Sequence, residues 1–426
     1  MRFVENGPDI PESLLQAHEE GKVVFFCGAG VSVPLGFPSF AGLVSKLYKR
    51  SGISPNKQQS IAISQNLYDL ALSILENQHI EGKRGVRREL FKLLYRKPKK
   101  LESETHASLL DLATLSDGSV RLVTTNYDRA FEYAKNQTEK SFESYSAPFL
   151  PVPKKSRWNG IVYLHGLLPS TYDEIKLNNL VLTSGDFGAA YLTERWASRF
   201  VTELFRNYIV CFIGYSLNDS VLRYMTDAML DDRLRGENVL PMYALVPESG
   251  ETKNVKAEWE AKGIIPILYS KTGHDHGMLH LTLKKWSEQY RDGFLAKKQI
   301  ITLEAQNHPS SDSQALLTDS EKRLLWAIVD KDGAGSKVFS SLDPLPPFEW
   351  IYTFSRREFS EKDLSRFGNE VSVKSNNKKR YSIFDRPMAH KYAPHMSLFQ
   401  SRDFLERPDP LMDNISDWLL ELAPVG

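Results

Sequence analysis

The 426-residue chain contains only two cysteines, Cys27 and Cys211. Two thiols are too few for a four-cysteine zinc site or for a disulfide framework. Each lies inside an apolar run that is typical of a β-strand. We therefore expect both thiols to be buried as small hydrophobic side chains, and we expect no metal centre.

Long apolar segments and an excess of one charge are also missing. No stretch approaches the ~20 apolar residues that a membrane-spanning helix needs. The N-terminal segment lacks the apolar core of a signal peptide. The formal net charge is +1, which gives no overall attraction for nucleic acid. We therefore expect a cytoplasmic protein that does not cross a membrane and does not bind nucleic acid directly.

The clearest feature present is a glycine loop that follows an apolar run, Val23–Cys27. A continuous apolar run bounded by glycine predicts a strand that is buried on both faces. The run leads into Gly28, Ala29 and Gly30, and a strand that ends in Gly-x-Gly is where α/β proteins bring backbone close to a phosphate. An ordinary strand-to-helix turn, with glycine needed only for its dihedral angles, is the alternative.

Two common nucleotide-binding patterns are absent from this loop. The dinucleotide fingerprint requires a third glycine, where this chain has Val33, and an acid about 20 residues after the strand. No Asp or Glu occurs between Glu20 and Asp69. The Gly-Lys-Ser/Thr of a phosphate-binding P-loop is absent as well. These absences argue against a dehydrogenase and against a P-loop nucleotidase.

Further apolar runs alternate with helical patterns along the chain. Continuous apolar strands separated by helices predict a parallel sheet covered on both faces, an α/β fold of the Rossmann-like class. Residues 141–158 indicate an irregular loop, and Ala190–Asn207 a long helix. The further strands are expected at Val120–Thr124, Gly160–Leu164, Leu180–Thr183, Tyr208–Ile213, Met242–Val246 and Ile264–Tyr269.

We predict three parts in the chain. Residues 1–299 form the nucleotide-binding domain, with a helical insertion at about 41–118. Residues 300–316 form a linker. Residues 317–426 form a smaller α+β domain, with Thr318 and Glu321 capping its first helix and a hairpin that joins 370–374 to 381–384.

Polar residues follow two of the predicted strands. Asn126 and Asp128 come directly after the second strand, and His165 ends the third. Taken singly, Asn126 and Asp128 are ordinary helix caps, and a lone histidine is more often a hydrogen-bonded core residue. Together they lie where ligands bind in parallel sheets, at the carboxyl ends of the strands.

In combination these motifs resemble the sirtuin-like family. The matching residues extend over roughly 12–292, and they are Gly28-Ala29-Gly30-x-Ser32, Gly36-Phe37-Pro38-x-Phe40, Thr125-Asn126-Tyr127-Asp128, His165-Gly166 and Gly214-Tyr215-Ser216. The resemblance implies that NAD+ binds as a substrate across the sheet. It implies Asn126 and His165 as catalytic residues. It also implies a set of NAD+-binding residues, namely Gly28, Ala29, Gly30, Ser32, Phe37, Thr125, Asp128, Gly214 and Ser216.

The departures from the family are informative too. Protein deacetylases of the family carry a four-cysteine zinc ribbon and usually an arginine after Phe40, whereas this chain has two cysteines and Ala41. The chain looks more like the zinc-free sirtuin-like effectors of bacterial antiphage defence. Such effectors hydrolyse NAD+ to ADP-ribose and nicotinamide and so deplete the infected cell.

We therefore expect an NAD+ glycohydrolase with an antiphage role. The resemblance implies homo-oligomers, with an ATPase of the translocase type or a phage protein as partner or trigger, and the sequence does not choose between these. Two alternatives remain at this point. One is a module that senses NAD+ or ADP-ribose without cleaving it, and the other is a sirtuin-type protein deacylase or an ADP-ribosyltransferase.

Overall fold

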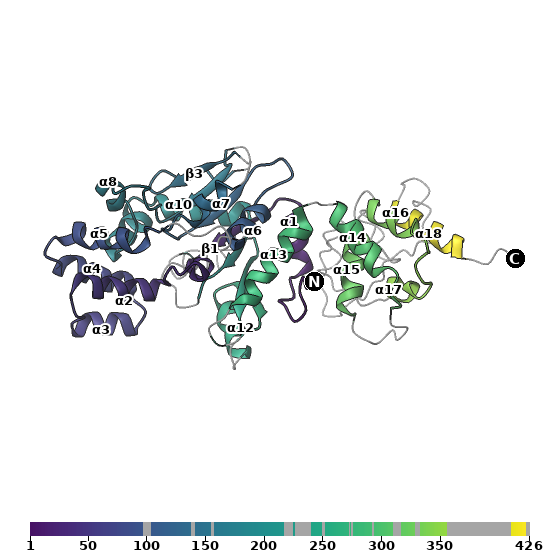
Figure 1. Cartoon of the computed structure of the whole chain (residues 1–426), viewed down its shortest axis with the longest axis horizontal. Helices are drawn as coiled ribbons and strands as arrows, with labels where there is room; N and C mark the ends of the chain where they lie inside the picture. Colours follow the sequence, from purple (N-terminus) through teal and green to yellow (C-terminus); the bar gives the residue numbers. More distant parts are fainter. Residues whose placement is uncertain are drawn as a thin grey trace. The chain divides into compact units, whose positions relative to one another are not determined.

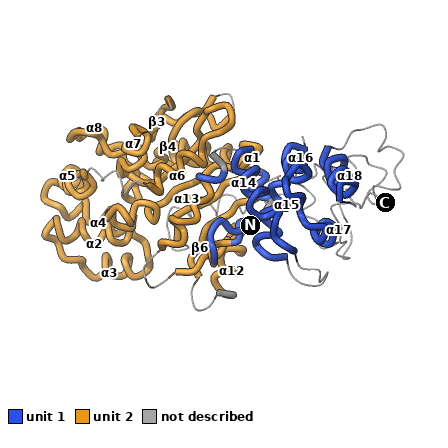
Figure 2. The backbone as a smooth tube through the Cα atoms, turned by 45° about the vertical axis from the view of Figure 1, so that its right-hand side comes forward, with its two compact units in different colours: residues 1–5, 9–16, 288–426 blue, residues 6–8, 17–287 orange. Residues whose placement is uncertain are grey.

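The computed structural model describes residues 1–96, 104–137, 141–154, 157–216, 225, 240–248, 252–271, 273, 276–291, 294–309, 317–328, 333–355 and 410–422. The contacts within the chain divide it into two compact units (Figure 2). The larger unit contains residues 6–8 and 17–287. The smaller unit contains residues 1–5, 9–16 and 288–426.

The larger unit is built on a parallel sheet of seven strands, in the order β3-β4-β2-β1-β5-β6-β7. This arrangement confirms the predicted Rossmann-like α/β class. The chain turns to opposite sides of β1 when it forms β2 and β5, so a ligand crevice is expected at the carboxyl end of β1. The strands are β1 (Val23–Cys27), β2 (Arg121–Thr124), β3 (Glu143–Ser146), β4 (Gly160–Tyr163), β5 (Ile209–Ile213), β6 (Met242–Pro247) and β7 (Ile264–Tyr269).

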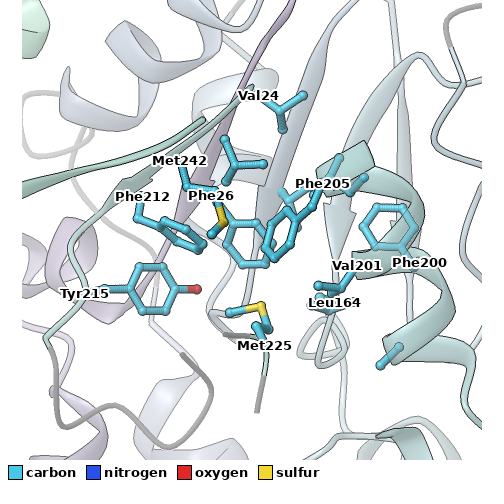
Figure 3. Packing of buried hydrophobic residues seen from close by; sticks show 14 of the residues in the cluster. Val24, Phe26, Leu164, Phe200, Val201, Phe205, Phe212, Tyr215, Met225 and Met242 are labelled. Atoms are coloured by element: carbon cyan, nitrogen blue, oxygen red, sulfur yellow. The ribbon is translucent and has the colours of Figure 1, made fainter. Parts of the chain in front are cut away.

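Strand β1 is buried along its whole length because helices cover both faces of the sheet. Side chains alternate between the faces of a strand. Phe25 packs edge-on against Trp286 of helix α13 (Gly277–Arg291), with ring centroids 5.6 Å apart. Phe26 points to the opposite face, where it lies beside Phe212 (Figure 3), with ring centroids 5.3 Å apart. The two cysteines are buried as predicted.

A group of helices between β1 and β2 confirms the predicted insertion. Helices α2 to α5 lie together at one end of the larger unit (Figure 1), around a core that includes Leu47, Leu72, Leu75, Val86 and Leu90. The short 3₁₀ helix η1 (Ala29–Leu35) precedes them. The helices are α2 (Phe40–Ser51), α3 (Lys57–Ser64), α4 (Tyr68–Gln78), α5 (Gly82–Leu94) and α6 (Glu104–Leu112).

Shorter helices connect and follow the remaining strands. Helix α10 is strongly amphipathic, and its apolar side, which includes Phe200 and Leu204, packs with Val24 and Phe26 of β1. The connecting elements are α7 (Ala130–Lys135), α8 (Glu174–Asn178), α9 (Ser184–Gly188), the π-helical turn η3 (Ala189–Thr193), α10 (Trp196–Asn207) and α12 (Thr252–Ala261).

Three sequence-based assignments in this unit were wrong. The expected strand Leu180–Thr183 is an extended loop, in which Val181 N–H bonds the His165 carbonyl and Thr183 caps α9. The loop expected at 141–158 contains edge strand β3, whose polar residues gave no apolar signal. The helix expected at Ala190–Asn207 is divided, because Arg195 adopts a left-handed conformation between η3 and α10.

The described part of the smaller unit is helical. Aromatic side chains form its core, and Phe339 lies 5.1 Å from Trp418 and 5.5 Å from Phe354 between ring centroids. Thr318 and Glu321 form the predicted capping pair. The helices are α14 (Phe294–Glu304), α15 (Asp319–Ile328), α16 (Ala334–Ser340), α17 (Trp350–Ser355) and α18 (Pro410–Leu422), while α1 (Glu12–Glu19) contributes residues to both units.

The smaller unit differs in extent from the part expected at 317–426. It begins at residue 288, and the segment expected as a linker from residue 300 starts inside α14, where Ile300 and Ile301 are buried. The hairpin expected across residues 370–384 lies outside the described residues. The role of this part of the chain in oligomerisation or partner binding stays a prediction.

Candidate functional site

The glycine loop is held against the end of β5 by backbone hydrogen bonds. Gly28 N–H donates to the Ile213 carbonyl at 2.8 Å, and Gly30 N–H donates to the Gly214 carbonyl at 3.0 Å. A Cβ on Gly30 would lie 2.7 Å from the Gly214 Cα, which is too close for any side chain. Gly28 and Gly30 must therefore be glycines, because the backbone at each position lies against the backbone of Gly214.

Asn126 is fixed by two hydrogen bonds at the end of β2. Its Nδ2 donates to the Gly28 carbonyl and to the Ser32 hydroxyl, each at 3.1 Å. A carbonyl oxygen only accepts, so the amide nitrogen must face Gly28. No described residue donates a hydrogen bond to Oδ1 of Asn126, and this oxygen is left to accept one from a ligand.

Ser32 connects the glycine loop to three other polar side chains. Its hydroxyl accepts a hydrogen bond from Asn126 and lies 3.2 Å from Nε2 of His106 on α6, and its polarity favours the charged form of Asp128. Burial raises the pKa of Asp128, and hydrogen bonds from Ala130 N–H and Ser32 partly offset that rise. Burial, with a smaller contribution from His280, lowers the pKa of His106 to about 3.

His165 follows β4 and is buried among aromatic rings. Its Nε2 lies 2.9 Å from the Tyr191 hydroxyl, and its ring meets Phe187 edge-on with centroids 5.1 Å apart. Burial lowers the pKa of His165 to about 3. The imidazole is therefore neutral at physiological pH, with one nitrogen available to accept a proton.

These residues meet in a pocket of about 550 Å³, a volume that includes its open mouth. Residues after β1, β2 and β4 supply its polar side, whereas α2 and α5 supply apolar side chains. The lining residues are Ala29, Ser32, Phe37, Pro38, Phe40, Leu43, Leu94, Thr125, Asn126, Tyr127, Asp128 and His165. A partly apolar pocket with a few converging polar groups is typical of a small-molecule site.

The structure brings both predicted catalytic residues into this pocket, with five of the nine predicted NAD+-binding residues. The four that are not among the lining residues are Gly28, Gly30, Gly214 and Ser216. Gly28, Gly30 and Gly214 pack backbone against backbone beside the pocket. Ser216 is exposed after β5. Contact between any of these residues and NAD+ stays a prediction.

Several residues around the site were not predicted from the sequence. Tyr191 and His106 each hydrogen-bond a predicted site residue, and Leu43 and Leu94 line the pocket. Tyr215 belonged to a recognised motif, yet its hydroxyl bond to Thr125, at 2.6 Å, had no sequence signal. Long-range contacts of this kind have no local pattern, because their partners are 26 to 90 residues apart in the chain.

The described residues contain neither a metal-binding cluster nor a membrane-spanning helix. No group of three or more His, Cys, Asp or Glu side chains there could hold a metal ion. No helix in that part of the chain combines the length and the apolar character needed to cross a bilayer.

The pocket lies at the carboxyl edge of a parallel sheet, beside the glycine loop, which is where open α/β sheets bind ligands. A model of the SIR2-like domain matches residues 120–267, which include Asn126, His165 and the Gly214-Tyr215-Ser216 segment after β5. This match supports a sirtuin-like family, whose members bind NAD+ and are typically NAD+-dependent enzymes.

The chain is also similar to an uncharacterised protein, y4cA, of Sinorhizobium fredii (strain NBRC 101917 / NGR234). The two are 31% identical over 347 residues, which cover 80% of this chain. The chain spans only about 28% of the length of that relative.

Proposed function

We propose that the pocket hydrolyses the nicotinamide N-glycosidic bond of NAD+ and releases ADP-ribose and nicotinamide. The observation that carries this proposal is the meeting of Asn126 and His165 in one pocket beside the glycine loop. A module that only bound the dinucleotide would have no need of a neutral imidazole in its nicotinamide pocket. The match to the SIR2-like domain supports NAD+ as the substrate.

The chemistry requires little acid catalysis from the protein. Nicotinamide leaves as a neutral pyridine, and an oxocarbenium-like centre develops on the ribose. The protein must then orient the ribose, exclude bulk water and direct one water molecule to the anomeric carbon. Overall, one water is consumed and one proton is released.

Asn126 suits the positioning role. Both N–H groups of its amide have acceptors within the protein, namely the Gly28 carbonyl and the Ser32 hydroxyl. The amide plane is therefore fixed before substrate arrives, and Oδ1 accepts a hydrogen bond from a ribose hydroxyl or from the attacking water. A group positioned in advance loses little entropy at the moment of reaction.

His165 suits the role of proton acceptor. In the free protein its pKa is about 3 because it is buried away from water. The phosphates of a bound dinucleotide bring negative charge, which favours the imidazolium form and raises this pKa. The neutral imidazole accepts the proton from a ribose hydroxyl or from water as the new C–O bond forms.

We propose, from the resemblance to antiphage effectors, that this activity depletes cellular NAD+ during infection. An enzyme of this kind must be silent until it is triggered. Residues 317–426 are the region we assign to homo-oligomerisation, or to contact with an ATPase of the translocase type or a phage trigger protein. The lack of a four-cysteine zinc ribbon disfavours a deacylase.

The test is to incubate the purified chain with NAD+, with and without a candidate partner, and to separate the products by chromatography. We expect equal amounts of nicotinamide and ADP-ribose. Binding of NAD+ without turnover under all conditions would favour the sensor alternative. Turnover that requires an acylated peptide would favour the deacylase.

A further inference from the structure

Tyr191 is the hydrogen-bond partner of His165 on the side of Nε2. The Tyr191 hydroxyl lies 2.9 Å from Nε2 of His165, and both side chains are buried. His165 lines the pocket, whereas Tyr191 is not among the lining residues. Because Nε2 is engaged by Tyr191, Nδ1 is the ring nitrogen that remains for a ligand in the pocket.

The backbone that carries Tyr191 departs from regular helix. Residues Ala189–Thr193 form a π-helical turn, closed by a hydrogen bond from Glu194 N–H to the Ala189 carbonyl at 2.9 Å. Such turns are rare and often occur at functional sites. Arg195 follows with a φ of 61°, a left-handed conformation that non-glycine residues seldom adopt.

This irregular segment is held in place by its neighbours. The Ser198 hydroxyl donates to the Tyr191 carbonyl at 3.0 Å. The Tyr191 ring stacks on Phe187, with centroids 6.0 Å apart and planes inclined by 21°. Phe187 in turn contacts the His165 ring edge-on. The histidine ring is therefore confined by aromatic contacts, and the tyrosine hydroxyl supplies its polar contact at Nε2.

We propose that Tyr191 is a positioning residue that holds His165 in the tautomer protonated at Nε2, an inference that rests on the proposed NAD+ hydrolysis. In this tautomer Nε2–H donates to the phenol oxygen, and Nδ1 carries the lone pair that can accept a proton. A phenol hydroxyl can donate or accept, so the proposed proton transfer to Nδ1, and not the 2.9 Å contact by itself, requires this tautomer. The opposite tautomer would place an N–H at Nδ1 and could not accept a proton there.

The proton transfers then balance without a charged tyrosine. The O–H bond of a ribose hydroxyl or of the attacking water breaks, and an N–H bond forms at Nδ1 of His165. The resulting imidazolium keeps its Nε2–H bond to Tyr191, which stays neutral. The proton leaves to solvent when the products dissociate, and the histidine returns to its starting tautomer.

Kinetics of Tyr191→Phe test this role. The variant keeps the ring and its stacking but loses the hydroxyl. We expect kcat for nicotinamide release to fall about tenfold, with little change in KM, because one oriented hydrogen bond is lost. Tyr48→Phe is the matched control, since the Tyr48 hydroxyl is also buried and donates to the Ala71 carbonyl at 2.7 Å, outside the pocket. The control should keep the parent kcat.

Nitrogen-15 spectra of the histidine rings provide a second readout that does not need activity. In the full chain the His165 signals, assigned by their loss in His165→Gln, should show a proton on Nε2. A proton on Nδ1 would overturn the proposal, as would an unchanged kcat in Tyr191→Phe. If the parent chain releases no nicotinamide, the proposed function fails, whereas the tautomer still decides whether Tyr191 orients His165.

Discussion

The sheet and the helical insertion contribute different kinds of side chain to the pocket. Residues that follow β1, β2 and β4 supply the polar groups that we assign to chemistry, among them Ser32, Asn126 and His165. Helices α2 and α5 supply apolar side chains, among them Leu43 and Leu94. The polar groups therefore lie on segments that follow short buried strands, whereas the helices supply the apolar wall of the pocket.

A residue of the insertion that does not line the pocket also contacts the segments next to His165. Arg87 of α5 is buried, pairs with Glu76 and Asp186, and donates to the Leu177 and Leu180 carbonyls. Asp186 belongs to α9, the helix that carries Phe187 to His165. We therefore expect substitutions on the sheet side to lower activity. Substitutions in the insertion should lower stability or weaken substrate binding.

The largest effect is expected from removing the polar groups on the sheet side. Asn126→Ala or His165→Ala should lower the rate of nicotinamide release at least about 100-fold, because each removes a group that orients or deprotonates. The thermal unfolding profile should remain cooperative. An active His165→Ala enzyme would rule out the assigned role of that histidine.

Breaking the buried ion pairs of the insertion should affect stability more than chemistry. Arg87→Ala leaves Glu76 and Asp186 without their buried partner, so we expect the free energy of unfolding to fall by about 3–5 kcal/mol. Urea titration measures this loss. Arg88→Ala is the matched control in the same helix, because Arg88 pairs with Glu81 at the surface. An equal loss of unfolding free energy in the two variants would show that the buried ion pairs of Arg87 do not stabilise the fold more than a surface pair does.

Acid should destabilise the protein through its buried histidines. His106 and His165 have folded pKa values of about 3, below the ordinary unfolded value of about 6.5. The unfolded chain therefore binds more protons between these values. Stability is fully present above pH 6.5 and declines as pH falls toward 3, by about 2 kcal/mol for each such histidine at pH 5.

The same urea titrations at pH 7.5 and pH 5 measure this acid sensitivity. His106→Asn removes one of the titrating groups, so the difference between the two pH values should shrink. A difference that is as large in the variant as in the parent would show that His106 is not held neutral in the folded state.

The apolar side of the pocket should affect substrate binding by a smaller factor. Leu94→Val removes about one methylene from the pocket wall, and we expect KM for NAD+ to rise about fourfold, with kcat little changed. Leu90→Val, a buried change in the same helix away from the pocket lining, is the control. A loss of kcat in Leu94→Val would mean that the helices contribute to the chemistry as well.

The polar side of the pocket was more predictable from sequence than its apolar side. Asn126, Asp128 and His165 follow apolar strands, and parallel strands gather their carboxyl ends at one edge, so their meeting followed from local pattern. Leu94 belongs to an amphipathic helix, α5, whose other apolar residues are mostly buried in the core. The helical pattern of apolar residues does not distinguish Leu94, which lines the pocket, from the residues that do not.

Two errors in the fold share a physical cause. Strand β3 (Glu143–Ser146) is polar because it lies at the edge of the sheet, where burial does not require apolar side chains. Leu180–Thr183 is apolar because it is buried beside His165, although it joins no strand. An apolar run in the sequence predicts that a segment is buried. It predicts a strand as well only where the buried segment lies in the middle of the sheet.

A crystal structure of the His165→Ala chain with NAD+ tests the central claim most directly, since this variant should bind the dinucleotide without consuming it. Our account predicts intact NAD+ with its nicotinamide ribose in the pocket, beside Asn126 Oδ1 and the space left by the imidazole. A dinucleotide bound elsewhere, or with its adenine ribose in that position, would contradict the account.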